Sequence, residues 1–205
     1  MSNLKVTYID SSSTQYDGNA DLIKVEFSGR ESTTNVGKLY LGDRHSSSFL
    51  QLRHRKCKRV VNCDKEIHSL SREEDVKYLN IDPSDRKSSI FEESFEFIDK
   101  SIQKGRNVTV LCETGNSKAA AIVVYYVMKK QLLTHTESIE IVKRFRGKIR
   151  IRPELLSALF KEEKKLMPLI KDKKSKKNSA ILVCGIIILV FGVLFGVIYS
   201  ITGKI

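Results

Sequence analysis

The chain has 205 residues, of which 41% are hydrophobic and 29% are charged, and its formal net charge is +12. This composition excludes a disordered or collagen-like chain, and four cysteines are too few for a fold built on disulfides. The length suits one domain of ordinary size with appendages. We therefore expect one folded domain with segments of different character on either side of it.

The amino-terminal segment, residues 1–35, is rich in Ser, Thr, Asn, Asp and Gly. Two short alternating stretches within it, residues 6–9 and 23–27, are candidate edge strands. Few apolar residues accompany them, so we expect a loosely ordered polar extension ahead of the domain.

Short strands and amphipathic helices alternate in the middle of the chain, which we assign to one domain over residues 36–167. Strands are predicted over residues 37–42, 59–63, 76–81 and 108–111. Capping boxes at Ser89–Glu92 and Thr134–Glu137 predict helix starts, and further helices are predicted over 119–130 and from Pro153 onward. This order predicts an α/β fold with a mostly parallel central sheet flanked by helices.

The strand at 108–111 runs directly into a short loop, residues 112–118, and then into a helix. A strand, a tight loop and a helix N-terminus form an anion cradle, because backbone N–H groups converge there and the helix dipole favours negative charge. A cysteine at its mouth should have a lowered pKa and be nucleophilic. The pattern indicates a phosphate monoester site, with Cys112 as the nucleophile and the phosphate held by Glu113, Thr114, Gly115, Asn116, Ser117 and Lys118.

From about residue 37 to 163 the chain resembles the dual-specificity branch of the cysteine-dependent protein phosphatases. Residues 37–42 resemble the opening strand of that family, residues 110–119 lie where it carries its Cys-x5-Arg signature, and residues 151–154 resemble its closing segment. Residues 78–81 followed by Asp85 resemble its general-acid loop. The resemblance implies a phospho-cysteine mechanism in which Asp85 is the general acid, with no metal and no organic cofactor.

Three positions depart from the family signature. Leu111 replaces the histidine before the cysteine, Lys118 replaces the arginine, and Ala119 replaces a Ser or Thr hydroxyl. Arginine grips two phosphate oxygens through a planar fork, whereas lysine offers a point charge, and a lost transition-state donor costs about 10²–10³ in rate. We expect a catalytically impaired member, a pseudophosphatase that acts as a binding or scaffold module. The alternative is an active protein phosphatase that uses Cys112, Asp85 and Lys118.

The ligand of such a cradle is expected to be a phosphorylated protein, on tyrosine or on serine or threonine, or a phosphoinositide headgroup. The basic segment Arg53–Arg59 is also compatible with nucleic acid. A membrane anchor argues against that partner, and no nucleic acid is expected.

The carboxy-terminal segment predicts that anchor. Residues 180–201 form an apolar run of 22 residues, and about 20 such residues span a hydrocarbon core as a helix. Before it, within a basic linker at 168–178, residues 171–177 contain five lysines and one aspartate. The positive-inside rule then places residues 1–177 in the cytosol. We expect a single-pass tail anchor over 179–202, first in the endoplasmic reticulum and second in the mitochondrial outer membrane.

Overall fold

The computed structural model describes residues 3–6, 25–28, 37–64, 75–83 and 89–176. The chain divides into two compact units, residues 1–165 and 166–205. Among the described residues no helix is both long and apolar enough to cross a membrane. The predicted span at 180–201 lies outside the described residues.

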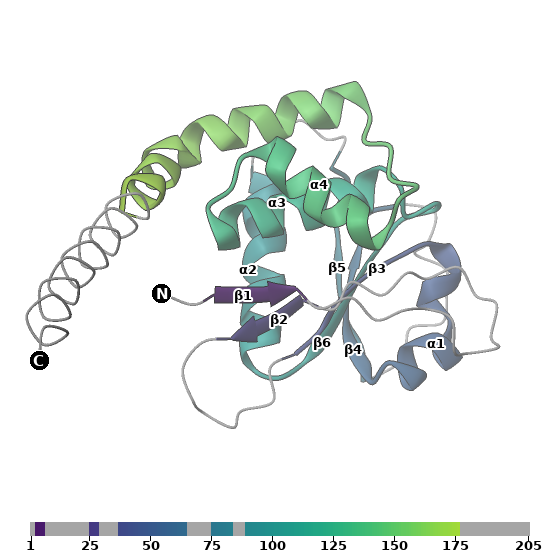
Figure 1. The fold of residues 1–205 in the computed structure, drawn as a ribbon. Helices are drawn as coiled ribbons and strands as arrows, with labels where there is room; N and C mark the ends of the chain where they lie inside the picture. Colours follow the sequence, from purple (N-terminus) through teal and green to yellow (C-terminus); the bar gives the residue numbers. More distant parts are fainter. Residues whose placement is uncertain (1–2, 7–24, 29–36, 65–74, 84–88, 177–205) are drawn as a thin grey trace, which may run out of the picture. The chain divides into compact units, whose positions relative to one another are not determined.

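The first unit contains a four-stranded sheet in which all pairs are parallel and the strand order is β3-β6-β4-β5 (Figure 1). Its strands are β3 (Leu39–Gly42), β4 (Cys57–Asn62), β5 (Lys77–Asn80) and β6 (Asn107–Leu111). The predicted parallel sheet is therefore confirmed. Because the strands are parallel, their carboxyl ends share one edge.

The two candidate edge strands of the amino-terminal extension do not join this sheet. β1 (Asn3–Val6) and β2 (Val25–Ser28) pair antiparallel with each other and form a two-stranded sheet of their own. β2 overlaps the predicted stretch 23–27, whereas β1 shares only Val6 with the predicted stretch 6–9, of which residues 7–9 lie outside the described residues.

Helices cover both sides of the four-stranded sheet. Figure 1 shows α1 on one side and α2, α3 and α4 on the other. Their bounds are η1 (Arg44–Ser47), α1 (Phe49–His54), α2 (Ser89–Gln103), α3 (Lys118–Gln131) and α4 (His135–Phe145). Residues 153–176 are also helical, beginning at the predicted Pro153.

The core lies between the sheet and α3. Residues 108–111 of β6 are buried, as expected for a central strand covered on both faces. α3 is buried along residues 119–128, because α2 and α4 cover the sides that the sheet leaves open. This explains why α3 is apolar all round rather than amphipathic.

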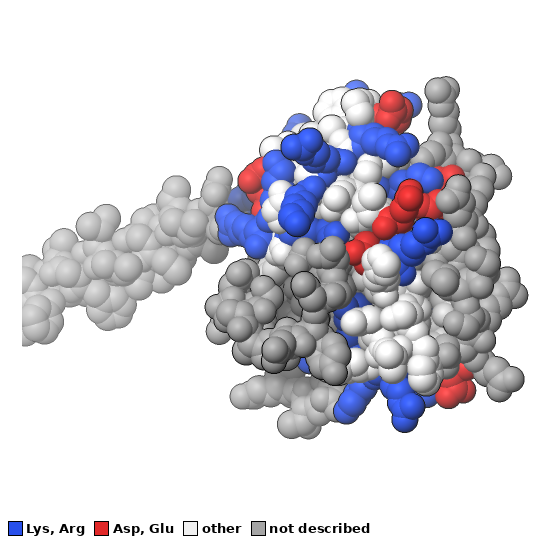
Figure 2. All heavy atoms as spheres, turned by 90° about the vertical axis from the view of Figure 1, so that its right-hand side faces the viewer, with Lys and Arg blue, Asp and Glu red and all other residues white. Residues whose placement is uncertain are grey.

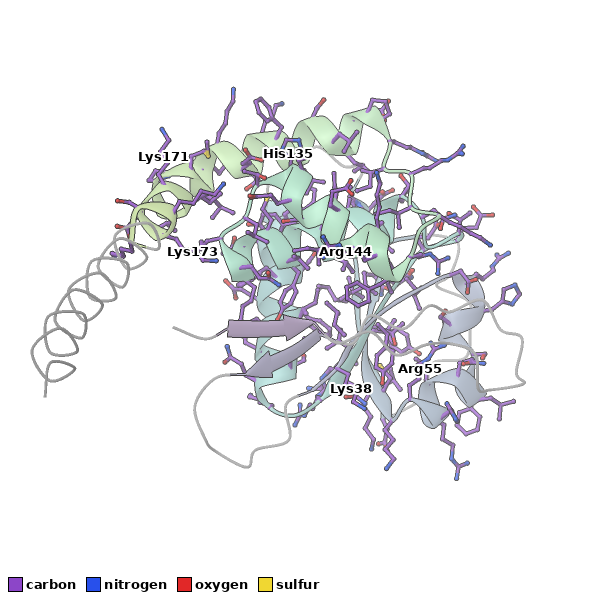
Figure 3. All side chains as sticks on the ribbon, in the orientation of Figure 1. Lys38, Arg55, His135, Arg144, Lys171 and Lys173 are labelled. Carbon is purple, nitrogen blue, oxygen red and sulfur yellow. The ribbon has the colours of Figure 1, made fainter. Side chains whose placement is uncertain are left out.

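At the amino end of the sheet, the side chain of Asn107 at the start of β6 bonds to the backbone of two neighbouring segments. The Asn107 side chain accepts a hydrogen bond from the Lys38 N–H at 3.0 Å and donates one to the Arg55 carbonyl at 2.7 Å. Figure 3 shows Lys38 and Arg55 at this end. The opposite, carboxyl edge is where the loops at the strand ends converge.

One of the two predicted capping boxes is confirmed. Thr134 caps α4 by accepting from the Glu137 N–H at 3.2 Å, and Glu137 accepts from the Thr134 N–H at 2.8 Å. The other predicted box places a helix start at Ser89, and α2 does begin there. Glu92 accepts hydrogen bonds from Tyr125 and Lys129 of α3.

Candidate functional site at the carboxyl edge of the sheet

The loop of residues 112–118 joins the end of β6 to the start of α3. Cys112 follows β6 directly and is 4% exposed. The Cys63 N–H donates to the Leu111 carbonyl at 2.9 Å, which continues the pairing of β4 with β6 up to the loop. Ser117 is the N-cap residue of α3. The structure thus brings the six predicted phosphate-binding positions and Cys112 together in one strand–loop–helix turn.

Gly115 forms the sharp bend of this loop. Its φ is +69°, a conformation that side-chain-bearing residues adopt at a cost. A Cβ at this position would lie 2.7 Å from the Gly42 carbonyl oxygen and 2.9 Å from an Arg146 nitrogen. The loop therefore requires glycine here both for its conformation and for its close approach to β3.

A buried arginine, Arg146, holds the loop from the end of α4. Its Nε donates to Asn116 Oδ1 at 3.0 Å and its Nη2 donates to the Thr114 carbonyl at 2.9 Å. Only 5% of Arg146 is exposed. The sequence reasoning missed this residue, because nothing local distinguishes it from the other basic residues near it.

Lys118, at the arginine position of the family signature, is already paired. Its Nζ lies 3.2 Å from Asp82 Oδ1, and the two side chains are only 19% and 12% exposed. Asp82 reaches the site because it follows β5, whose pairing with β4 is extended by the Ile81 N–H donating to the Asn62 carbonyl at 2.9 Å. We predicted Asp85 as the acid of this segment, and Asp85 lies outside the described residues.

A second carboxylate contacts the loop from the end of β4. The Glu113 N–H donates to Asp64 Oδ2 at 3.3 Å. Asp64 is also a residue that sequence reasoning missed. The signal that identifies both Asp64 and Asp82 is their position just after parallel strands, since the carboxyl ends of such strands meet at one edge.

The described cysteines differ in their surroundings. Burial raises the pKa of Cys57, whose thiol contacts Thr109 Oγ1 at 3.1 Å. Burial also raises the pKa of Cys63 well above its ordinary value; the neighbouring Cys112 adds to this and Lys118 opposes it. Both therefore remain thiols at neutral pH. Within the described ranges no hydrogen bond reaches the Cys112 sulfur.

Two of the three departures from the signature lie in the core. Leu111 and Ala119 flank the loop and are fully buried. Neither offers a polar atom to Cys112, so the thiol lacks both an imidazole before it and a hydroxyl beside it. In the ranges that the structure describes, no group of three or more His, Cys, Asp or Glu residues is arranged to hold a metal ion.

Comparison with known proteins identifies the family of the domain that contains this loop. The family model "dual specificity phosphatase, catalytic domain" matches residues 39–165. Dual specificity protein phosphatase 1B of Arabidopsis thaliana is 34% identical over 97 residues, which cover 45% of this chain and 58% of that protein. Dual specificity protein phosphatase 19 of Mus musculus is 30% identical over 126 residues, covering 59% and 57%. The chain spans less than two thirds of the length of these relatives.

Solved structures share the fold. Human DUSP28 superposes with a TM-score of 0.57 at 20% identity, covering 68% of this chain and 99% of that one. A human tyrosine phosphatase-like serine/threonine/tyrosine-interacting protein superposes with a TM-score of 0.58 at 23% identity, covering 63% of this chain and 93% of that one. PTPMT1 in complex with PI(5)P superposes with a TM-score of 0.55 at 19% identity, covering 63% of this chain and 92% of that one. At these identities the likeness concerns the fold alone.

Proposed function

The chain belongs to the dual specificity phosphatase family, and we propose that it is a membrane-tethered member that binds phosphate monoesters in loop 112–118 while turning them over poorly. Its ligand is a phosphorylated protein or a phosphoinositide headgroup. The observation that carries the proposal is the ion pair between Lys118 and Asp82 at the position of the family's arginine.

Lys118 and its ion pair with Asp82 each weaken catalysis. Lysine cannot form the planar, two-pronged contact that an arginine makes with two phosphate oxygens. In addition, the charge of Lys118 is partly neutralised by Asp82, so an entering phosphate dianion must compete with a carboxylate that is only 12% exposed. Transition-state charge is therefore stabilised less than in a loop with a free arginine.

Binding is affected less than turnover, because the backbone of the loop is well held. Gly115 keeps the bend, and Arg146 fixes Thr114 and Asn116 from behind. Backbone N–H groups at the start of α3 remain a site for an anion. The proposed module is thus a phosphate binder in which the cradle persists and the chemical step is slow.

The decisive experiment compares the full chain, purified in neutral detergent, with a variant that carries Leu111→His, Lys118→Arg and Ala119→Ser. Turnover of an aryl phosphate is measured together with orthovanadate binding by calorimetry. We expect orthovanadate to bind the unchanged chain and the triple variant to raise kcat/KM by about 10²-fold or more.

Cys112→Ser in the triple variant is the matched control, and it should abolish the gained turnover if the gain is thiol chemistry. Wild-type turnover equal to that of the triple variant, and lost on Cys112→Ser alone, would contradict the impaired function. Absence of orthovanadate binding would contradict the phosphate site itself.

The second candidate function is an active phosphatase that uses Cys112 as nucleophile and Asp85 as general acid. It is favoured by the placement of Cys112, which lies directly after β6 and ahead of the α3 N-terminus. Asp85→Asn distinguishes the two functions: in an active enzyme it lowers kcat and flattens the acidic-to-neutral pH profile, whereas in an impaired module it changes neither.

Membrane tethering rests on the sequence of residues 171–201. An uncharged apolar segment long enough to cross a bilayer follows five lysines, which orients the preceding domain toward the cytosol. We expect a fluorescent protein fused to residues 171–205 to localise to the endoplasmic reticulum and to resist alkaline extraction. In a second fusion, which carries the whole chain, deletion of residues 180–201 should release the protein from the membrane. Unchanged membrane association after that deletion would exclude this tether.

A further inference from the structure

A strictly alternating basic segment lies beside the proposed phosphate loop. From residue 144 to 152 every second residue is Arg or Lys, and the residues between them are Phe, Gly, Ile and Ile. Lys148, Arg150 and Arg152 are exposed, whereas Ile149 is buried and Ile151 is half-buried. Residues 149–152 lie between the turn at 147–148 and the helix that begins at 153. Their alternation is typical of an extended segment with one face on the protein and the other in solvent. Arg150 and Arg152 therefore share the solvent side, and Lys148 is exposed in the turn before them.

Hydrogen bonds fix this segment to the loop. The Arg150 N–H donates to the Asn116 carbonyl at 2.9 Å, and the Arg152 N–H donates to Ser117 Oγ at 3.2 Å. The cationic side chains thus begin from backbone that touches the two loop residues preceding Lys118. The segment lies at the right of Figure 1, and the face turned to the viewer in Figure 2 carries many Lys and Arg side chains.

These exposed cations are not used in ion pairs in the described part of the chain. No carboxylate described there lies within ion-pair distance of Lys148, Arg150 or Arg152. The nearby acidic residues Glu113 and Glu154 are themselves exposed. In contrast, the lysines of α3 that contact α2 are paired with carboxylates. A structural role does not account for three unpaired cations beside an anion site.

We propose, resting on the proposed phosphate site, that Arg150 and Arg152, assisted by Lys148, form a second anionic subsite for acidic residues flanking a phosphorylated residue in a peptide. Side chains on one face of an extended segment repeat about every 6.6 Å, and an extended peptide has the same repeat. Alternate acidic side chains of such a peptide can therefore meet successive cations. An inositol headgroup, which carries its phosphates on one small ring, matches such a row less well.

The test uses the full chain in neutral detergent and two fluorescent phosphotyrosine peptides that differ only in having Glu or Ala at alternating positions beside the phosphotyrosine. Affinity is measured by fluorescence polarisation at low and high salt. We expect the Glu peptide to bind about ten-fold tighter than the Ala peptide at low salt, since exposed charge pairs contribute about two- to five-fold each. The advantage should shrink at high salt.

The variant Arg150→Ala with Arg152→Ala should reduce that advantage to less than about two-fold while the Ala peptide still binds. Its charge-matched control is Lys104→Ala with Arg106→Ala. Both control residues are exposed and lie just before the amino end of β6, whereas the loop follows its carboxyl end. The control should keep the full preference for the Glu peptide.

Each outcome separates the subsite from the phosphate site. Equal binding of both peptides by the unchanged chain, or a preference that survives in the Arg150 and Arg152 variant, overturns the subsite and leaves the phosphate site standing. Failure of both peptides to bind overturns both. A soluble inositol polyphosphate that binds more tightly than the Glu peptide, and loses affinity in the same variant, overturns the peptide ligand in favour of a lipid headgroup.

Discussion

Two lysine–carboxylate pairs of similar burial lie in different parts of this molecule and have different consequences. Between α2 and α3, Lys130 pairs with Asp99 at 2.7 Å, with side chains 28% and 15% exposed. At the loop, Lys118 pairs with Asp82 at 3.2 Å, with side chains 19% and 12% exposed. The chemistry of the pairs is alike, so the difference lies in their neighbours.

The neighbours of the α2–α3 pair are structural. Asp99 also accepts a hydrogen bond from the buried Tyr126 hydroxyl at 3.2 Å, so this carboxylate of α2 contacts two side chains of α3. Burial and the adjacent Asp99 raise the pKa of Tyr126, which keeps its hydroxyl a donor at any physiological pH. The loop pair instead lies close enough to Cys63 to act on its pKa, and Lys118 belongs to the loop that carries Cys112. The Lys130–Asp99 pair thus stabilises a helix interface, whereas the Lys118–Asp82 pair occupies the proposed anion site.

The largest effect is expected from Gly115→Ala. The substitution places a side chain at a positive φ and within 2.7 Å of the Gly42 carbonyl, which should cost about 2–4 kcal/mol and abolish orthovanadate binding. Gly105→Ala is the control, because Gly105 has the same φ of +69° but is exposed beyond α2. It should cost about 1 kcal/mol and leave binding intact. Equal effects in thermal unfolding and calorimetry would show that the loop is not tightly packed.

The next effect is expected from Asp99→Ala. Removing this carboxylate removes the hydrogen bond from the Tyr126 hydroxyl and the ion pair with Lys130, a loss of about 2 kcal/mol. The melting temperature should fall by about 4–8 °C while affinity for orthovanadate stays the same. A change in affinity would mean that the helix interface is coupled to the loop.

Asp82→Asn should change the affinity for orthovanadate rather than the stability of the helix interface. Without the carboxylate, Lys118 is free to attract an anion, and orthovanadate affinity should rise by about three- to ten-fold. Orthovanadate should also raise the melting temperature more than it does in the unchanged chain, because the anion replaces the lost partner. Weaker binding in Asp82→Asn would show that Asp82 supports the ligand rather than competing with it.

The smallest effect concerns the pH dependence of Glu92 between α2 and α3. Partial burial acts to raise its pKa, but hydrogen bonds from Lys129 and Tyr125 lower it overall. A lowered folded-state pKa contributes stability above the ordinary carboxyl range, and that stability is lost as the pH falls through the lowered pKa. Glu92→Gln should therefore lower the melting temperature by about 1–3 °C at pH 7 and by less at pH 3.

Melting curves recorded by circular dichroism across this pH range test the prediction. Lys129→Met offers a matched removal of the other charge and should flatten the same part of the profile. A difference between wild type and Glu92→Gln that stays constant from pH 7 to pH 3 would rule out the ionised carboxylate as the source.

The local structure of the domain could be predicted well from sequence. Buried β-branched runs identified β4 and β6, and the Thr134–Glu137 box identified the start of α4, because these signals depend on residues a few positions apart. α2 also begins at the predicted Ser89, but the local pattern does not reveal that Glu92 accepts hydrogen bonds from Tyr125 and Lys129 on a different helix.

The order of strands and helices and the loop that carries Cys112 could be predicted from the sequence, since backbone propensity, apolar periodicity and the positions of glycine are local properties. The contacts around that loop depend on the tertiary fold: Asp82 pairs with Lys118, Asp64 accepts from the Glu113 N–H, and Arg146 donates to Asn116. These partners come from the ends of β5, β4 and α4, and only the parallel packing of the sheet brings such distant ends to one edge. The charged residues that surround the loop are therefore a property of the fold, even though the loop itself can be identified in the sequence.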